Sequence, residues 1–374
     1  MRRADWLIIV VPVVAMVALI WYQRAQQGAR KLPTVSRAAD GVGGGGASAK
    51  PGKESDKGAQ GRGGKGGSGK GGAAGVGGDD DRAGSPYPPD NPFYLIRQFG
   101  WGSESTQFGH DVTKKPGEGP MAIAVESAGN LVVLDQVNHR VQRLDAAGRF
   151  VSTIKLDLAT PQDLVANSLG LIGLLDRQAR VVEILGRDDK PRNRLRIDDV
   201  PTGIFSDGNG FFLEDNPREV VALTDADGMI VADKEALPGR PMRSGKRLRA
   251  EIVDRSKAVV AVQVFTEKGE VVFSNPLRFS GYLLRLVLVD SDLLGNIYIG
   301  VEVGRQEKQP PFKVVEPKIV LTKILPNGVI GRSVELPSDP VLEESLRQFC
   351  VAADGTLYRA HLTADGVALE SFHF

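Results

Sequence analysis

Short apolar segments separated by turn residues form the dominant pattern over most of the chain. Two such segments, Met121–Val125 and Asn130–Asp135, are separated by a polar turn around Gly129. A third segment, Arg140–Leu144, follows, and the turn Asp145–Gly148 ends the unit. Strands of this length cannot bury their apolar faces alone, so the pattern predicts that further units stack beside this one.

The same pattern recurs through the rest of the chain. Turns that resemble one another occur at residues 145–148, 186–189, 225–228, 266–269, 325–328 and 363–366. A short apolar strand after a glycine recurs at residues 129–133, 170–172, 210–213, 295–299 and 355–358. A period of about 40 residues with four short strands per unit is typical of a β-propeller. Six turns therefore predict an all-β fold with six blades.

The first unit also carries a more specific motif. A proline-led strand begins at Pro120, a Gly-Asn turn lies at residues 129–130, and Asp135 is followed by Asn138–Arg140, which reads Asn-His-Arg. These residues, in this order, resemble one repeat of the NHL family. The resemblance implies a six-bladed β-propeller, and it implies no particular ligand because propellers support many functions.

Two later units keep part of this motif. The matching positions of the second unit, where the Asp-to-Arg spacing is one residue shorter, are Pro161, Asp176 and Arg180. The matching positions of the third unit are Pro201, Gly203 and Arg218. In the first unit, Asp135 at a strand end and Arg140 at the next strand start are expected to pair across the turn. This spacing predicts a structural role for the pair and for His139 between them.

The propeller is predicted to span residues 91–374. Two terminal segments, Phe93–Phe99 and Val367–Phe374, have the character of strands. A propeller removes its open edge by pairing a terminal strand into the last blade. One of these two segments is therefore expected to close the ring, although the sequence does not indicate which segment supplies which strand.

The N-terminal part has a different character. Trp6–Tyr22 carries no charge and is about 17 residues long, the short end of the range for a membrane-spanning helix. Trp6 and Tyr22 fit an interfacial aromatic belt. Residues 1–31 are predicted to form a single-pass membrane anchor. A cleaved signal peptide and a buried helix are the alternatives, but no small-residue cleavage site follows the segment.

The anchor and the segment after it set the expected location. A short N-terminal tail before a single span is typical of a signal anchor, which places the propeller outside the cytoplasm, in the periplasm of a Gram-negative cell. Residues 32–90 are rich in glycine and show no apolar periodicity, so they are predicted to form a disordered linker. Basic residues within the linker are candidates to contact anionic lipid or wall polymer.

Composition narrows the possible chemistry. The formal net charge is +1, which argues against nucleic acid as a partner. Cys350 is the single cysteine, so no internal disulfide and no thiolate metal cluster can form. The histidines are scattered without metal-ligand spacing, and no nucleophile elbow or phosphate-binding loop occurs. We therefore predict no catalytic residue, no cofactor site and no metal site.

Two segments are candidate partner-binding surfaces. A basic run begins at Arg240 and is expected to form a loop between blades three and four. A long insertion between Gly300 and Ile319 lengthens the fifth unit, and insertions in propellers go to loops on one face. The candidate contact residues are Arg243, Lys246, Arg247, Arg249 and Phe312.

Two classes of function fit these observations. The first is a membrane-tethered propeller that binds a protein or an anionic polymer without catalysis. The alternative is a metal-dependent propeller enzyme of the lactonase or lyase type, which would hold a divalent cation such as calcium over the central channel. The tether, the basic run and the missing catalytic constellation favour the interaction module over the enzyme. A third reading, RNA binding as in some NHL proteins, would require a cytoplasmic propeller.

Overall fold

The computed structural model describes residues 92–374, except residues 115, 217–218, 232–235 and 340–342. The predicted anchor (1–31) and linker (32–90) lie outside the described residues, so both stay predictions. In the described part, no helix has the length and apolar character needed to cross a membrane. Its regular elements are β-strands, and they belong to one compact unit, Gly77–Phe374.

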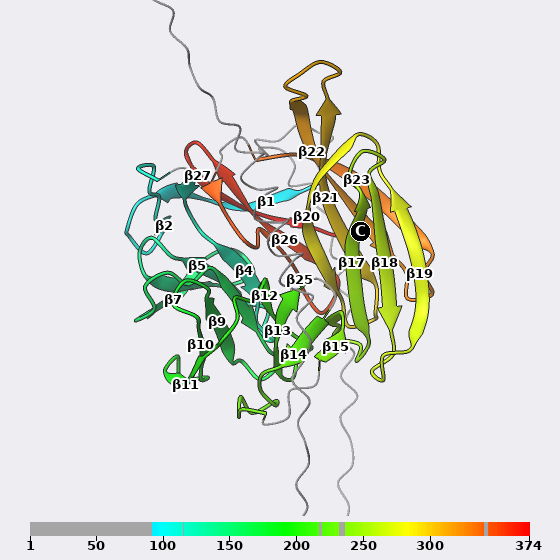
Figure 1. The fold of residues 1–374 in the computed structure, drawn as a ribbon. Helices are drawn as coiled ribbons and strands as arrows, with labels where there is room; N and C mark the ends of the chain where they lie inside the picture. The colour runs from blue at the N-terminus through cyan, green and yellow to red at the C-terminus, as the bar shows by residue number, and fades with distance from the viewer. Residues whose placement is uncertain (1–91, 115, 217–218, 232–235, 340–342) are drawn as a thin grey trace, which may run out of the picture. The chain divides into compact units, whose positions relative to one another are not determined.

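The strands form six sheets, the blades, around a central axis (Figure 1). Blade one contains β4 (Ala122–Val125), β5 (Leu131–Asp135), β6 (Arg140–Leu144) and β7 (Phe150–Lys155). Blade two contains β8 (Asp163–Ala166), β9 (Ile172–Asp176), β10 (Val181–Leu185) and β11 (Pro191–Arg196). Blade three contains β12 (Gly203–Ser206), β13 (Phe211–Asn216), β14 (Glu219–Ala222) and β15 (Ala236–Pro238).

Most strands of the remaining blades are longer, although three are only two or three residues long. Blade four contains β16 (Arg240–Pro241), β17 (Arg247–Asp254), β18 (Val259–Phe265) and β19 (Val271–Arg278). Blade five contains β20 (Tyr282–Ser291), β21 (Ile297–Gln306), β22 (Val314–Ile324) and β23 (Ile330–Pro337). Blade six contains β25 (Phe349–Val351), β26 (Leu357–Thr363), β27 (Gly366–Phe372), β1 (Tyr94–Trp101) and β2 (Gln107–Phe108). Outside the blades, β3 (Gly117–Glu118) pairs in parallel with β24 (Glu343–Glu344).

Both terminal segments contribute to closing the ring. The C-terminal strand β27 is the third strand of blade six, and the N-terminal strand β1 pairs antiparallel with it. Phe99 lies opposite Val367 in this pairing. The seam is tight, because a Cβ atom on Gly366 would lie 1.8 Å from the Phe99 carbonyl oxygen. The six-bladed, all-β prediction is thus confirmed for the described residues.

The predicted turns fall at two different places in the blades. Five of them join the third and fourth strands, as at Asp145–Gly148, where the Gly148 amide donates to the Asp145 carbonyl at 2.8 Å. The sixth, around Gly366, instead joins the second and third strands of blade six. The difference arises because the outer strands of blade six come from the N-terminal end of the chain.

The core lies between neighbouring blades. Each blade packs on both faces, and for this reason all five residues of β5 are buried. One apolar cluster, including Leu134 and Leu174, joins blades one and two. Another, including Val262 and Val301, joins blades four and five. Burial on both faces also explains why the strands appear in the sequence as continuous apolar segments.

Candidate functional site

The motif pair of blade one is structural, as predicted. Arg140 Nε donates to Asp135 Oδ2 at 2.8 Å, and Asp135 is fully buried. The Asn138 amide donates to the same carboxylate oxygen at 2.9 Å. Arg140 also donates to backbone carbonyls of residues 103, 104 and 107, in the segment that leads from β1 into blade one. The pair therefore fixes both the hairpin and the segment next to the seam.

Blade two shows why the shorter spacing matters. Asp176 lies opposite Val181 in the ladder, as Asp135 lies opposite Arg140. Arg180 is therefore the counterpart of His139, and both adopt left-handed backbone angles (φ 55° and φ 50°). Arg180 donates to the Asp198 carbonyl instead of pairing with Asp176. Of the third unit's motif residues, Arg218 lies outside the described residues.

The innermost strands of the blades line a central channel. The residue before the last paired position is equivalent in the six first strands, and in each of them it lines the same cavity. One residue from each blade, in order from blade one to blade six, forms this channel ring: Ala124, Val165, Phe205, Arg240, Asp290 and Cys350. Blades four and five thus contribute charged residues, whereas the other four contribute apolar or weakly polar ones.

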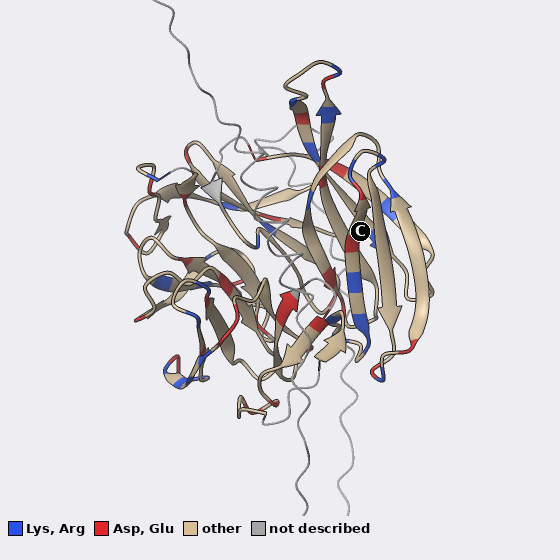
Figure 2. Ribbon diagram, viewed as in Figure 1, with Lys and Arg blue, Asp and Glu red and all other residues tan. Residues whose placement is uncertain are grey.

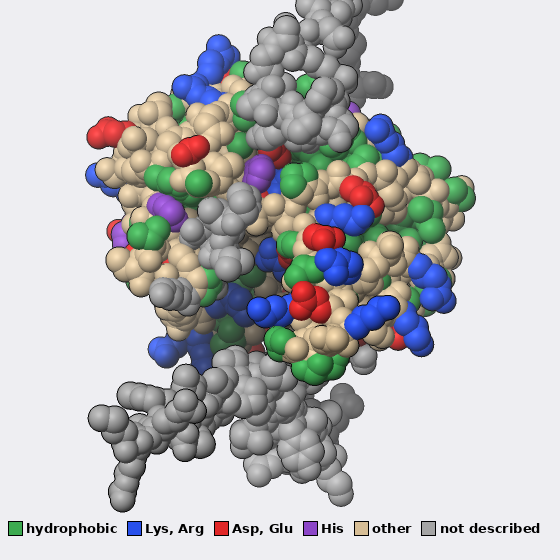
Figure 3. All heavy atoms as spheres, turned by 90° about the horizontal axis from the view of Figure 1, so that it is seen from above, with side chains coloured by type: hydrophobic (Ala, Val, Ile, Leu, Met, Phe, Trp, Pro, Cys, Tyr) green, Lys and Arg blue, Asp and Glu red, His purple; other side chains and the backbone are tan. Residues whose placement is uncertain are grey.

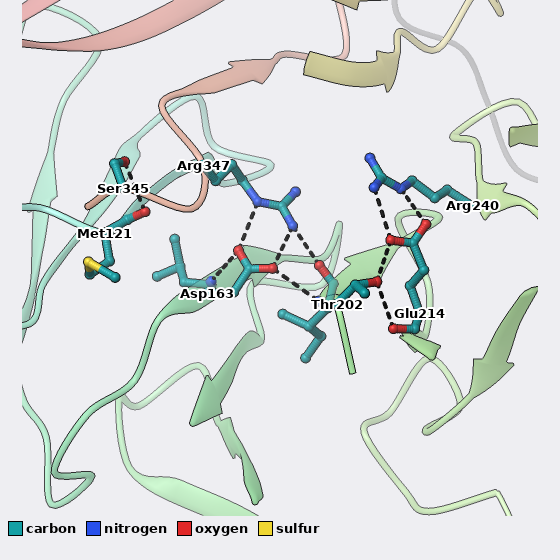
Figure 4. Close-up of polar contacts among 9 residues, drawn as sticks. Met121, Asp163, Thr202, Glu214, Arg240, Ser345 and Arg347 are labelled. Atoms are coloured by element: carbon teal, nitrogen blue, oxygen red, sulfur yellow. Dashed lines mark hydrogen bonds and ion pairs between the residues drawn. The ribbon is translucent and has the colours of Figure 1, made fainter. Parts of the chain in front are cut away.

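Arg347 closes one end of the channel. It precedes β25 of blade six, and its Nε and Nη2 atoms donate to the two carboxylate oxygens of Asp163 in blade two, both at 2.9 Å (Figure 4). Its Nη2 atom also donates to the Ile204 carbonyl of blade three at 2.7 Å. Burial opposes the charged form, but the charge and hydrogen bonds of Asp163 outweigh it and raise the pKa of Arg347. This contact joins three blades across the channel.

Arg240 approaches the same region from blade four (Figure 4). Its Nε and Nη2 atoms donate to the carboxylate of Glu214 at 2.7 and 3.0 Å. Its guanidinium carbon lies 4.3 Å from the Phe205 ring centroid, and that of Arg347 lies 4.9 Å from the same centroid. Two paired guanidinium groups therefore contact one aromatic ring, an arrangement favoured by the negative ring face.

Arg243 lies at the other end of the channel, in the turn after β16. Its Nη1 atom donates to Asp290 Oδ1 at 3.3 Å and to the Ser291 carbonyl in blade five. Asp290 also accepts from the backbone amides of Ser291 at 2.8 Å and Val351 at 3.1 Å. We call this end, lined by Ser206, Gly208, Arg243 and Ser291, the turn-side mouth.

Donors exceed acceptors in the channel. Each lining carboxylate is engaged, whereas Nη1 of Arg240, Nη1 of Arg347 and Nη2 of Arg243 make no hydrogen bond to any described residue. Burial raises the pKa of the Cys350 thiol, so it stays protonated. Within the described ranges, no group of three His, Cys, Asp or Glu residues is placed to hold a metal ion. The site is built to donate hydrogen bonds.

The structure separates the residues of the basic run. The sequence predicted a loop between blades here, and this prediction was wrong. The run forms β16, a turn and β17, and basic residues recur along β17 (Figure 2). Arg243 reaches the channel, and Lys246 ends the same turn. Arg247 is buried, with its guanidinium 5.7 Å from the Phe212 ring centroid. Arg249 donates to Gln263 in the neighbouring strand at 3.0 Å.

Phe312 is exposed, but it lies in blade five, far from the blade-four turn that holds Arg243. It lies beyond Gln306, at the tip of the β21–β22 hairpin, and its side chain is 52% exposed. The strand β21 begins at Ile297 beside the turn-side mouth and ends at Gln306. The hairpin therefore projects from the end opposite the mouth. The structure does not bring Phe312 together with the basic residues.

Arg347 escaped the sequence prediction, and Arg240 was named only as the start of the basic run, not as a channel residue. Each stands in or just before the first strand of its unit, where the unit carries no motif residue. Alignment of the first strands on the turn that follows each one would have revealed a shared position occupied by Ala, Val, Phe, Arg, Asp and Cys. The pairing of Arg347 with Asp163 left no signal, because 184 positions separate them.

No protein-family model and no curated protein matches the chain. Among solved structures, hydrazine synthase of Kuenenia stuttgartiensis is similar (TM-score 0.45, 14% identity, 65% of this chain and 73% of that chain). A streptogramin B lyase gives a TM-score of 0.41 at 14% identity over 75% of this chain and 97% of the other. A member of the DUF4221 family from Bacteroides vulgatus gives 0.44 at 8% identity, over 76% and 98%. The propeller assignment rests on this chain's own strand order.

Proposed function

We propose that this protein is a non-catalytic interaction module, tethered to a membrane by its N-terminal apolar segment, that binds an acidic protein or anionic polymer. The propeller is placed outside the cytoplasm, and its repeats are assigned to the NHL family. The partner binds at the turn-side mouth of the channel. The excess of hydrogen-bond donors over acceptors in the channel carries this proposal.

The charges at the mouth support an acidic partner. Arg243 and Lys246 belong to one turn beside the mouth, and Arg243 is only partly neutralised by Asp290 at 3.3 Å. Elsewhere, acidic and basic side chains alternate over part of the face shown in Figure 3, so that part carries no single-sign field. A guanidinium group with a free edge recognises carboxylates and other oxyanions directly. An acidic segment therefore gains the most binding free energy at the turn-side mouth.

The remaining channel groups fit binding better than chemistry. A general base needs an available carboxylate or imidazole, and a nucleophile needs an ionised or activated group. Asp290 already accepts from three donors, and the Cys350 thiol is protonated. The proposal accordingly includes no metal cofactor. Phe312 is proposed as a separate partner contact at the opposite end of blade five.

The test uses the full-length protein in detergent and a dye-labelled hexaglutamate peptide, with hexaglutamine as the neutral control. Fluorescence anisotropy should show binding of hexaglutamate alone, with an affinity that falls as salt concentration rises. Addition of EDTA should leave the affinity unchanged. Equal binding of the two peptides, or no binding of either, contradicts the proposed function. Loss of binding in EDTA would instead favour a metal-dependent site.

A further inference from the structure

The channel holds a small cavity at the level of the ring. Its volume is about 40 Å³, and its lining includes the six ring residues. One water molecule takes up about 30 Å³ in the liquid. The cavity therefore has room for a small group at the level of the ring.

The two sides of the cavity differ in chemistry. Ala124, Val165 and Cys350 form an apolar side from blades one, two and six. Arg240 lies on the other side, with Phe205 beneath its guanidinium group. The free Nη1 atoms of Arg240 and Arg347 and the free Nη2 atom of Arg243 are donors at the same cavity. The lining carboxylate, Asp290, already accepts from three donors, so a group that enters is best recognised by accepting hydrogen bonds from the arginines.

The two ends of the cavity also differ. Asp163 and Arg347 cross the channel two residues before the ring level, because Asp163 precedes Val165 on β8. The turn-side mouth at Arg243 is the other end. An entering group thus comes from the mouth and meets Arg347 at the closed end.

We propose that the ring cavity takes a single carboxylate group of the acidic partner, which enters through the turn-side mouth and accepts hydrogen bonds from Arg240, Arg243 and Arg347. This inference rests on the proposed function and specifies which group is recognised. A carboxylate is planar and has two acceptor oxygens, which suits a cavity of this volume. A phosphate, with four oxygens around its phosphorus atom, is the larger and non-planar group, and the competition arm below distinguishes the two.

The experiment compares variants of the full-length protein with the labelled hexaglutamate peptide. Ala124→Val adds two methyl groups to the cavity and changes no charge, and it should weaken binding by about tenfold. Arg243→Gln removes a donor at the mouth and should weaken binding by a similar factor. The matched control is Ala146→Val, which adds the same two methyl groups in the exposed turn of the same blade, outside the cavity lining, and it should bind like the wild type. Circular dichroism confirms that each variant is folded.

A competition arm identifies the group. Sodium acetate should displace hexaglutamate more effectively than sodium chloride at equal ionic strength, and sodium phosphate should act no better than chloride. Displacement by phosphate as effective as that by acetate would overturn the carboxylate assignment. If hexaglutamate binds the wild type and Ala124→Val equally, the cavity is not used, although the proposed function survives. If hexaglutamate does not bind the wild type at all, the proposed function itself fails, and the inference with it.

Discussion

Blade one and blade four have the same four-stranded architecture, yet they place their charged residues in opposite parts of the molecule. Blade one holds its buried charges, Asp135 and Arg140, at the hairpin between β5 and β6 and contributes Ala124 to the channel. Blade four contributes Arg240 to the channel and Arg243 to the mouth. Blade five, its neighbour, adds Asp290. The blade with the recognisable motif builds structure, and the blades without it build the candidate site.

The difference shows how a repeat fold separates stability from binding. A propeller blade needs its hairpins fixed, and a buried Asp–Arg pair does this wherever the spacing allows it. The channel position lies on the first strand of each blade. The side chain at this position makes no contribution to the hairpin between the second and third strands. This position is therefore free to vary from Ala124 to Arg240 without disturbing the blade. A motif search finds the residues that fix the hairpin and passes over the channel position.

The largest expected effect concerns the blade-one pair. Asp135→Ala leaves Arg140 buried without its carboxylate, and the loss of one partner of a buried pair costs about 3–5 kcal/mol of unfolding free energy. Urea unfolding of the full-length protein measures this loss. Asp176→Ala in blade two should cost less, since Asp176 accepts only from Thr160 and Ala179. Equal losses in the two variants would contradict the distinction between the two hairpins.

Folded Asp135→Ala protein should still bind hexaglutamate with wild-type affinity. The pair lies outside the channel lining, so its removal affects stability alone. A large change in affinity at a temperature where the variant is folded would show that structure and binding are not separated.

The second prediction concerns the channel side of the comparison. Asp290→Asn removes the charge that partly neutralises Arg243, so the mouth becomes more positive. Hexaglutamate binding should tighten by about tenfold, equivalent to ~1.4 kcal/mol. Stability should fall, because an NH2 group replaces one of the two oxygens that accept from the Ser291 and Val351 amides, so affinities are compared at a temperature where both proteins are folded. Weaker binding in this variant would mean that Asp290 itself contacts the partner.

The smallest expected effect lies in blade two. Glu183 is buried opposite Leu174 in blade two. The equivalent residue of blade one is Gln142, which is buried opposite Val133. Burial raises the pKa of the Glu183 carboxyl, and Arg194 at 3.8 Å offsets this only in part. Since the folded-state pKa lies above the unfolded-state value, ionised Glu183 destabilises the fold at neutral pH. That penalty disappears as the pH falls below the unfolded-state pKa.

Glu183→Gln installs the blade-one residue and should therefore raise the unfolding temperature at pH 7. The gain should vanish below about pH 4, where the carboxyl is protonated in both states. Thermal unfolding followed by circular dichroism across this pH range tests both statements. A lower unfolding temperature at pH 7 would show that the contact with Arg194 outweighs the effect of burial.

Part of the candidate site could be read from local sequence. The basic run was found because its residues are neighbours in the chain, and two of them, Arg240 and Arg243, do reach the channel. Local sequence could not show which other residues of the basic run are buried. Whether Arg247 is buried against Phe212 depends on the packing of blade four against blade three. Strand β17 also begins within the run, so the expected loop was wrong.

The sequence by itself determined the number of blades, the positions of one turn in each blade and the Asp135–Arg140 pair. These features depend on residues a few positions apart, and local spacing is sufficient to encode them. The tertiary structure alone decided the channel ring, the contact of Arg347 with Asp163, and the strand exchange that joins β1 to β27. These contacts arise only when the ring closes and brings together residues from opposite ends of the chain.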